Sequence, residues 1–148
     1  MADVPHPYLG GSPTPDSINS MVLSEFAASG NQCTEIGQGF AVARRVVSPD
    51  DLRPGGYVSG PTQFALADAA LWYLVFGAIG RVEPMALTSE LSIRYLRPAI
   101  GETMWARAEL DAAGRRNVVG TVRIWLDDRD DKVTAVAQGT YVLPHMAT

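Results

Sequence analysis

One long apolar segment, residues 61–79, constrains the fold more than any other part of the chain. Pro61 suits the first turn of a helix, where its missing N–H costs nothing, so we expect Gly60 to be the N-cap. Gly80 marks the end of the segment. Apolar residues occupy nearly all of its faces, which is typical of a helix buried in a protein core. Its length and the central Asp68 argue against a membrane span.

Four later segments alternate apolar and polar residues with a period of two, as antiparallel strands do when one face of the sheet is covered. They are residues 86–96, 103–110, 117–126 and 133–143. In the first of them the apolar residues share one phase: Leu87, Leu91, Ile93 and Tyr95. The polar residues share the other: Thr88, Glu90, Ser92 and Arg94. A further strand is expected at residues 39–47, which are β-branched and aromatic.

The order of these elements predicts an α+β layer arrangement, with a sheet wrapped around the apolar helix. A short helix over residues 18–28, capped by Asp16 or Ser17, is expected before the first strand. Residues 1–15 are predicted to be a flexible tail, because prolines and glycines recur in them. Residues 16–148 then form one domain.

Composition excludes several classes of function. The net charge is −4 and no run of basic residues is present, so no nucleic-acid partner is expected. The single cysteine, Cys33, excludes an internal disulfide and suits a reducing cytosol, and no signal peptide is visible, so we expect a cytoplasmic protein. The only histidines, His6 and His145, lie near the termini, which argues against a Ser-His-Asp triad and against a metal site.

Asp68 is the only charged residue between Pro61 and Gly80. Burying a carboxylate costs several kcal/mol unless it is paired or hydrogen-bonded. One interpretation is a general base or nucleophile. The other is a carboxylate that reaches solvent or bonds to a nearby backbone amide.

The start of the same helix offers free N–H groups and the positive end of the helix dipole, which together stabilise an oxyanion. Pro61 has no N–H, so the donors would come from Gly60, Thr62 or Gln63. An ordinary capped helix start is the alternative. Basic residues near turns are candidates for binding phosphate, or are solvated turn charges: Arg94, Arg97, Arg115 and Arg116.

Several motifs together resemble the hotdog-fold thioesterases, specifically their PaaI-like branch. They read SGPTQFALADAALWYLVF, TSELSIRYLRPAIGETMWARAEL, GRR and AVAQGTY, within residues 40–143. The resemblance implies a five-stranded antiparallel sheet wrapped around the long central helix. It also implies a homodimer joined through its sheets or a homotetramer built as a dimer of dimers, with the active site at the dimer interface. No cofactor is implied, since coenzyme A is part of the substrate.

The resemblance also implies roles for individual residues. Asp68 falls on the nucleophile or general base, Gly60 on the oxyanion-hole glycine, and Thr88 on a hydroxyl that holds the attacking water. The implied substrate-binding residues lie at the helix start and in basic turns: Ser59, Thr62, Gln63, Arg97, Arg115 and Arg116. Two positions depart from the family pattern. Ser59 stands where the family has histidine, and Arg53 stands where it often has asparagine.

These observations predict an enzyme, an acyl-CoA thioesterase acting on a small or medium acyl- or aryl-CoA. The two departures keep an alternative open, a non-catalytic hotdog protein that binds acyl-CoA or lipid. A hotdog hydratase is disfavoured, because its site needs a histidine that the folded body lacks. Neither a membrane nor a nucleic acid is expected as a partner.

Overall fold

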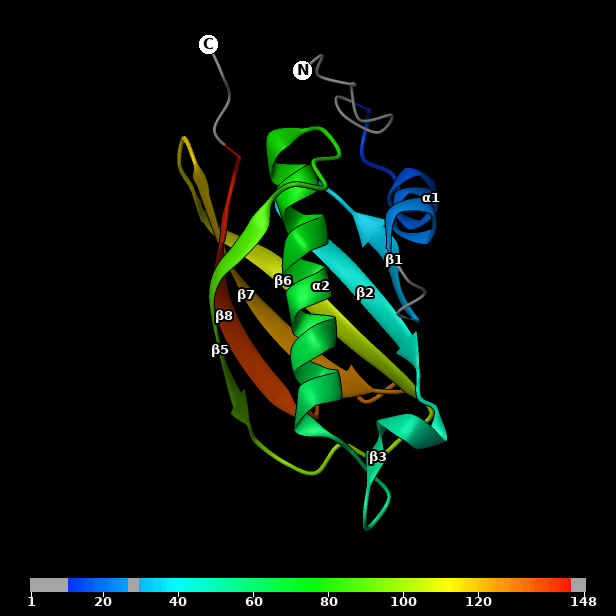
Figure 1. Ribbon diagram of the computed structural model, residues 1–148. Coiled ribbons are helices and arrows are strands. Elements are labelled where there is room, and N and C mark those ends of the chain that lie inside the picture. Colours follow the sequence, from blue (N-terminus) through cyan, green and yellow to red (C-terminus); the bar gives the residue numbers. More distant parts are fainter. Residues whose placement is uncertain (1–10, 27–29, 145–148) are drawn as a thin grey trace.

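The computed structural model describes residues 11–26 and 30–144, in which an antiparallel sheet curves around one long helix (Figure 1). The six strands of this sheet follow the order β1-β2-β6-β7-β8-β5, and β3 and β4 form a separate hairpin. In chain order the elements are α1 (Pro15–Glu25), β1 (Asn31–Ile36), β2 (Phe40–Val46), the 3-10 helix η1 (Pro49–Asp51), β3 (Leu52–Arg53), β4 (Tyr57–Val58), α2 (Gly60–Ile79), β5 (Leu87–Tyr95), β6 (Thr103–Ala113), β7 (Asn117–Leu126) and β8 (Ala135–Val142). The predicted α+β arrangement is confirmed.

The central helix α2 packs against all six strands of the large sheet. Gly120 and Gly139 face each other across β7 and β8, in the middle of the covered face. A Cβ atom at Gly120 would lie 2.8 Å from Leu71 Cδ2, and one at Gly139 would lie 2.9 Å from Leu71 Cδ1. The two glycines therefore leave room for the Leu71 side chain, and α2 packs closely against the sheet at this point.

Both ends of α2 follow from local chemistry. Ser59, not Gly60, is the N-cap: its backbone is extended and its hydroxyl oxygen accepts from the Thr62 N–H. Gly60 is the first helical residue, so the predicted cap is wrong by one position. At the other end Gly80 adopts a left-handed backbone with φ of +77°, which glycine adopts without steric cost.

The argument from length against a membrane span is also wrong. With 20 residues, α2 is long and apolar enough to cross a membrane, and it is the one such helix among the described residues. The core helix of a globular protein meets the same criteria of length and composition. Here the apolar side chains of α2 are largely buried against the sheet.

The helix near the N-terminus lies three residues earlier than predicted. It spans Pro15–Glu25, with Thr14 as N-cap, and not residues 18–28. Thr14 and Ser17 form a reciprocal capping box, in which each hydroxyl oxygen accepts from the other residue's N–H, and proline at the first position favours the same start. Of the predicted tail, residues 1–10 lie outside the described residues, and Pro15 belongs to α1.

The sheet has six strands and not five, because β1 adds to the edge formed by β2. Only Cys33 of β1 is buried, so this segment lacks the apolar alternation of a half-covered strand. The outer edge of β1 is held by Asn19 of α1, whose side chain exchanges two 2.8 Å hydrogen bonds with the Cys33 backbone. Helix α1 thereby covers one edge of the sheet.

Candidate active site

The Asp68 side chain lies half-buried on α2, facing strands β5 and β8. Its Oδ1 atom accepts hydrogen bonds from Thr88 Oγ1 and from the Tyr141 hydroxyl, each 2.7 Å long. The Tyr141 hydroxyl also lies 3.1 Å from the Asp68 carbonyl oxygen. Within the described residues Oδ2 accepts no hydrogen bond, so one carboxylate oxygen is held and the other is available for chemistry.

Tyr141 remains a hydrogen-bond donor over the whole physiological pH range. Burial raises the pKa of its hydroxyl, and the nearby charge of Asp68 raises it further. Thr88, to which the resemblance gives the role of holding the attacking water, is thus hydrogen-bonded to Asp68, with Tyr141 as a third member of the cluster.

The start of α2 leaves one backbone donor without a partner. Pro61 has no N–H, the Thr62 N–H donates to Ser59 Oγ at 3.3 Å, and the Gln63 N–H donates to the Ser59 carbonyl at 3.2 Å. For Gly60 no acceptor is found among residues 11–26 and 30–144. Of the three predicted amide donors, Gly60 is the one free to bind an incoming carbonyl oxygen.

Gly60 also lines a cavity of about 570 Å³. The Tyr95 hydroxyl donates to the Gly60 carbonyl at 2.8 Å and so holds the end of β5 against the helix start. Arg53 and Arg97 both line the cavity, and within the described part of the chain neither forms an ion pair. The lining residues come from the β3–β4 hairpin, the α2 start and the end of β5: Arg53, Tyr57, Val58, Gly60, Pro61, Gln63, Tyr95, Leu96, Arg97, Pro98 and Ala99.

Of the other predicted binding residues, Gln63 also lines the cavity, whereas Ser59, Thr62, Arg115 and Arg116 do not. Gln63 is buried, and its side chain donates to the Val58 carbonyl and accepts from Thr134, which gives it a role in the core. Arg115 and Arg116 lie in the turn between β6 and β7 and do not line the cavity. Among the described residues no group of three His, Cys, Asp or Glu side chains is arranged to hold a metal ion.

Asp68 and Gly60 of one chain cannot act on the same carbonyl group. They lie eight residues apart on one helix, which corresponds to about 12 Å along its axis. Reacting atoms must approach to roughly 3 Å. The structure therefore brings Thr88 to Asp68, and Tyr95 to Gly60, as two separate half-sites on the same helix.

An antiparallel sheet wrapped around one buried helix is the hotdog fold, which this chain shares with solved thioesterases and PaaI proteins. The chain belongs to the thioesterase superfamily, whose family model matches residues 55–136. The predicted family, the hotdog fold and the prediction of an enzyme that hydrolyses thioesters are confirmed.

Solved structures share this fold. A protein whose thioesterase activity is inferred, from Silicibacter sp., is 28% identical, with a TM-score of 0.77 over 88% of this chain and 92% of that chain. The PaaI protein from the phenylacetic acid degradation operon of E. coli is 24% identical, with a TM-score of 0.71 over 86% of this chain and 92% of that chain. A mutant of the phenylacetic acid degradation protein PaaI from Thermus thermophilus is 25% identical, with a TM-score of 0.66 over 79% and 96%. A search of curated protein sequences found no match.

Sequence reasoning missed three residues of the site region, namely Tyr141, Tyr95 and Asp51. Tyr141 lies in the AVAQGTY segment, where alternation gives it the covered face, and this was the only signal for it. Tyr95 shares the apolar phase of its strand, which does not indicate that its hydroxyl reaches the helix start. Asp51 lies in a polar, turn-rich stretch that gave no reason to expect a buried carboxylate.

Proposed function

We propose that this protein hydrolyses acyl-CoA thioesters at a site that combines Asp68 of one copy with the Gly60 N–H of a second copy. The observation that carries this proposal is the pair of half-sites on α2. A hydroxyl-bound carboxylate and a free N–H beside a cavity lie too far apart to serve one carbonyl group within one chain.

Strand β5 supplies a way to bring the two half-sites together. It is an edge of the sheet, and among the described residues no strand pairs with its outer side. Leu87 is 67% exposed there and Tyr95 is 50% exposed, whereas soluble proteins usually protect such an edge. Asp68 accepts a hydrogen bond from Thr88 near one end of β5, and the Gly60 carbonyl accepts one from Tyr95 at the other end. Antiparallel pairing of β5 with β5 of a second copy would therefore bring Asp68 beside the second copy's Gly60.

In this arrangement the thioester carbonyl oxygen accepts a hydrogen bond from the Gly60 N–H, which stabilises the negative charge that develops on it. The free Oδ2 of Asp68 then takes a proton from a water molecule, whose oxygen bonds to the carbonyl carbon. Alternatively, Oδ2 attacks that carbon and water hydrolyses the resulting anhydride. By either route the carbon–sulfur bond breaks, coenzyme A leaves as a thiolate, and a carboxylic acid is released.

The cavity beside Gly60 suits a small-molecule thioester, since ligand sites commonly enclose roughly 300–1,000 Å³. Arg53 and Arg97 line it and supply positive charge to a chain whose net charge is −4. We assign these two guanidinium groups to the phosphates of coenzyme A. Arg53 stands where the family often has asparagine, so this chain offers a charge where relatives offer an amide. The acyl group is proposed to be a small or medium acyl or aryl group.

Replacing Asp68 by asparagine tests the proposal. Thiol release would be followed over short, medium, long and aromatic acyl-CoAs. Loss of the Asp68 carboxylate as general base or nucleophile is expected to lower kcat by roughly 10²–10⁴-fold. Asp111→Asn is the matched control, because Asp111 also accepts from a threonine hydroxyl of a neighbouring strand, Thr121 at 2.5 Å, and it lies outside the site. Unchanged turnover in Asp68→Asn would remove this residue from the chemistry.

A thiol-reactive dye is suitable for this assay. The only cysteine, Cys33, is buried, and burial raises the pKa of its thiol to about 12. The native protein itself therefore contributes little thiolate to the signal. Single turnover in ¹⁸O-labelled water tests the nucleophilic route in one direction: label in the Asp68 carboxylate requires an anhydride that water attacks at the Asp68 carbon, whereas label in the released acid is compatible with both routes.

A further inference from the structure

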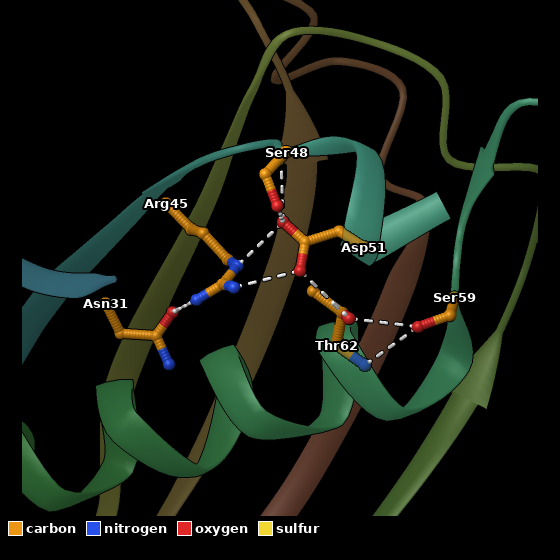
Figure 2. Close-up of polar contacts among 6 residues, drawn as sticks. All are labelled: Asn31, Arg45, Ser48, Asp51, Ser59 and Thr62. Atoms are coloured by element: carbon orange, nitrogen blue, oxygen red, sulfur yellow. Dashed lines mark hydrogen bonds and ion pairs between the residues drawn. The ribbon is translucent and has the colours of Figure 1, made fainter. Parts of the chain in front are cut away.

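A partly buried ion pair, Arg45–Asp51, joins strand β2 to the loop that leads into α2 (Figure 2). The Asp51 side chain accepts from Arg45 Nε at 3.0 Å and from Arg45 Nη2 at 2.9 Å, so the pair is bidentate. Asp51 also accepts from the Ser48 N–H at 2.9 Å and from the Ser48 hydroxyl at 3.3 Å. Arg45 in turn donates to Asn31 Oδ1 of β1 at 3.1 Å. One carboxylate is therefore fixed from two directions beside the end of β2.

A buried carboxylate of this kind is stable only in its charged, bonded form. Asp51 is 4% exposed, and an unpaired charge at such a position would cost several kcal/mol. Burial alone would raise the pKa of Asp51, but the hydrogen bonds from Arg45 and Ser48 outweigh burial and lower it. Both oxygens of the Asp51 carboxylate accept hydrogen bonds, which fix its position.

The same residue contacts the start of α2 through both its backbone and its side chain. The Asp51 carbonyl accepts from the Ser59 N–H at 2.8 Å. Asp51 Oδ1 lies 3.5 Å from the Thr62 hydroxyl, which accepts from the Ser59 hydroxyl at 2.9 Å. Figure 2 shows the contacts of Asp51 with Thr62, and of Thr62 with Ser59, at the first turn of the helix. Gly60, whose N–H is free, lies between the two residues that Asp51 holds.

We infer that Asp51, anchored by Arg45, is a positioning residue for thioester hydrolysis, which fixes Ser59 and Thr62 and thereby the direction of the Gly60 N–H. This inference rests on the proposed function. Asp51 does not line the cavity and is not expected to touch substrate. Its effect is therefore expected in kcat, where the alignment of the donor with the developing oxyanion matters, and not in KM. A misplacement of about 1 Å can lower a rate by 10²-fold.

The experiment compares Asp51→Asn with wild-type protein by steady-state kinetics and by hydrogen exchange of the peptide that covers residues 58–66. The asparagine keeps the size of the side chain but loses the charge and one of the two oxygens that face Arg45. We expect kcat to fall roughly ten- to a hundredfold with KM little changed, and exchange to speed up at the helix start only. Arg45→Lys keeps the positive charge without the bidentate geometry, so we expect its kcat to fall less than that of Asp51→Asn.

A control separates positioning from general loss of stability. Ile18→Val removes one buried methyl group from α1, away from the start of α2, and should change neither kcat nor exchange of residues 58–66. Wild-type kcat in a folded Asp51→Asn protein would overturn the inference. If that variant does not fold, Arg45→Lys decides in the same way, and unchanged kcat and exchange overturn it. If wild-type protein releases no thiol from any acyl-CoA, the proposed function fails, while unchanged exchange in Asp51→Asn overturns the positioning role separately.

Discussion

Complementary substitutions in the two half-sites test whether the active site is shared between two copies of the chain. Asp68→Asn removes the carboxylate, and Gly60→Pro removes the free N–H. The backbone accepts proline at position 60, because Ser59 before it is already extended, with φ of −66° and ψ of 153°, and proline suits the first turn of a helix. Its Cβ would lie 3.1 Å from the Tyr95 hydroxyl oxygen, so the Tyr95 side chain has to shift slightly. Each homodimer should be nearly inactive, since loss of one oxyanion donor costs about 10²–10³-fold and loss of the base roughly 10²–10⁴-fold.

The expected activity follows from the separation of about 12 Å between Asp68 and Gly60 along α2, which excludes a complete site within one chain. In a two-fold symmetric dimer each site takes its acid from one copy and its N–H from the other. A heterodimer of an Asp68→Asn chain with a Gly60→Pro chain then contains one intact site and should show about half the wild-type kcat per dimer. A heterodimer of a wild-type chain with a chain that carries both substitutions contains no intact site.

The assay is thiol release by heterodimers isolated through two different affinity tags after co-expression. A site within one chain reverses both results, because the heterodimer of single variants would then be inactive and the heterodimer with the double variant would show about half the wild-type activity. That reversal would refute the shared site. Both heterodimers carry the same two substitutions, so differences in folding do not explain a difference between them.

Two further predictions follow from buried groups. Tyr141→Phe removes the hydroxyl that donates to Asp68 at 2.7 Å. Because a hydrogen bond to a charged group contributes about 1.5–3 kcal/mol, we expect this variant to have a lower melting temperature and a lower kcat. Wild-type values of both would contradict this prediction. Asp51 has a pKa that is lowered in the folded state, so the stability it contributes is present above the unfolded value of about 3.9 and is lost as the pH falls through the lower folded value. Urea unfolding between about pH 5 and pH 2 should therefore depend less on pH in Asp51→Asn than in wild-type protein, and equal dependence would show that the ion pair does not govern acid stability.

Elements with strong local signals were predictable from the sequence. The apolar run of α2 and its terminal glycine specify the helix to within one residue, because burial on all sides and the left-handed end are local properties. Strands β6, β7 and β8 alternate because the inner face of the sheet meets the helix. Strand β1 was missed because its stability comes from pairing with β2 and from Asn19, and neither contact leaves a pattern in residues 31–36.

The candidate site was predictable only in part. Asp68 was identifiable because it is the only charge in an apolar helix, and its burial had to be compensated by some partner. One of its partners is Tyr141, which lies 73 positions further along the chain, so only the folded sheet brings the two residues together. Asp51 was not identifiable at all. Its burial depends on Arg45 lying beside it, which is a consequence of how the η1 turn folds back on β2.

Thr88 presents the one real conflict between two sequence arguments. Simple alternation in residues 86–96 gives Thr88 the same phase as Glu90, away from the helix, whereas the family resemblance gives it a role beside Asp68. A register shift between Thr88 and Glu90 resolves this conflict: Thr88 pairs with Tyr141, on the covered face, while Glu90 pairs with Thr140, on the opposite face. The same shift moves Leu87 out of the apolar phase in which alternation would put it, and Leu87 is 67% exposed. An irregularity of one residue in β5 thus turns the Thr88 hydroxyl to the carboxylate, and it leaves an apolar side chain at the edge where we propose that a second copy pairs.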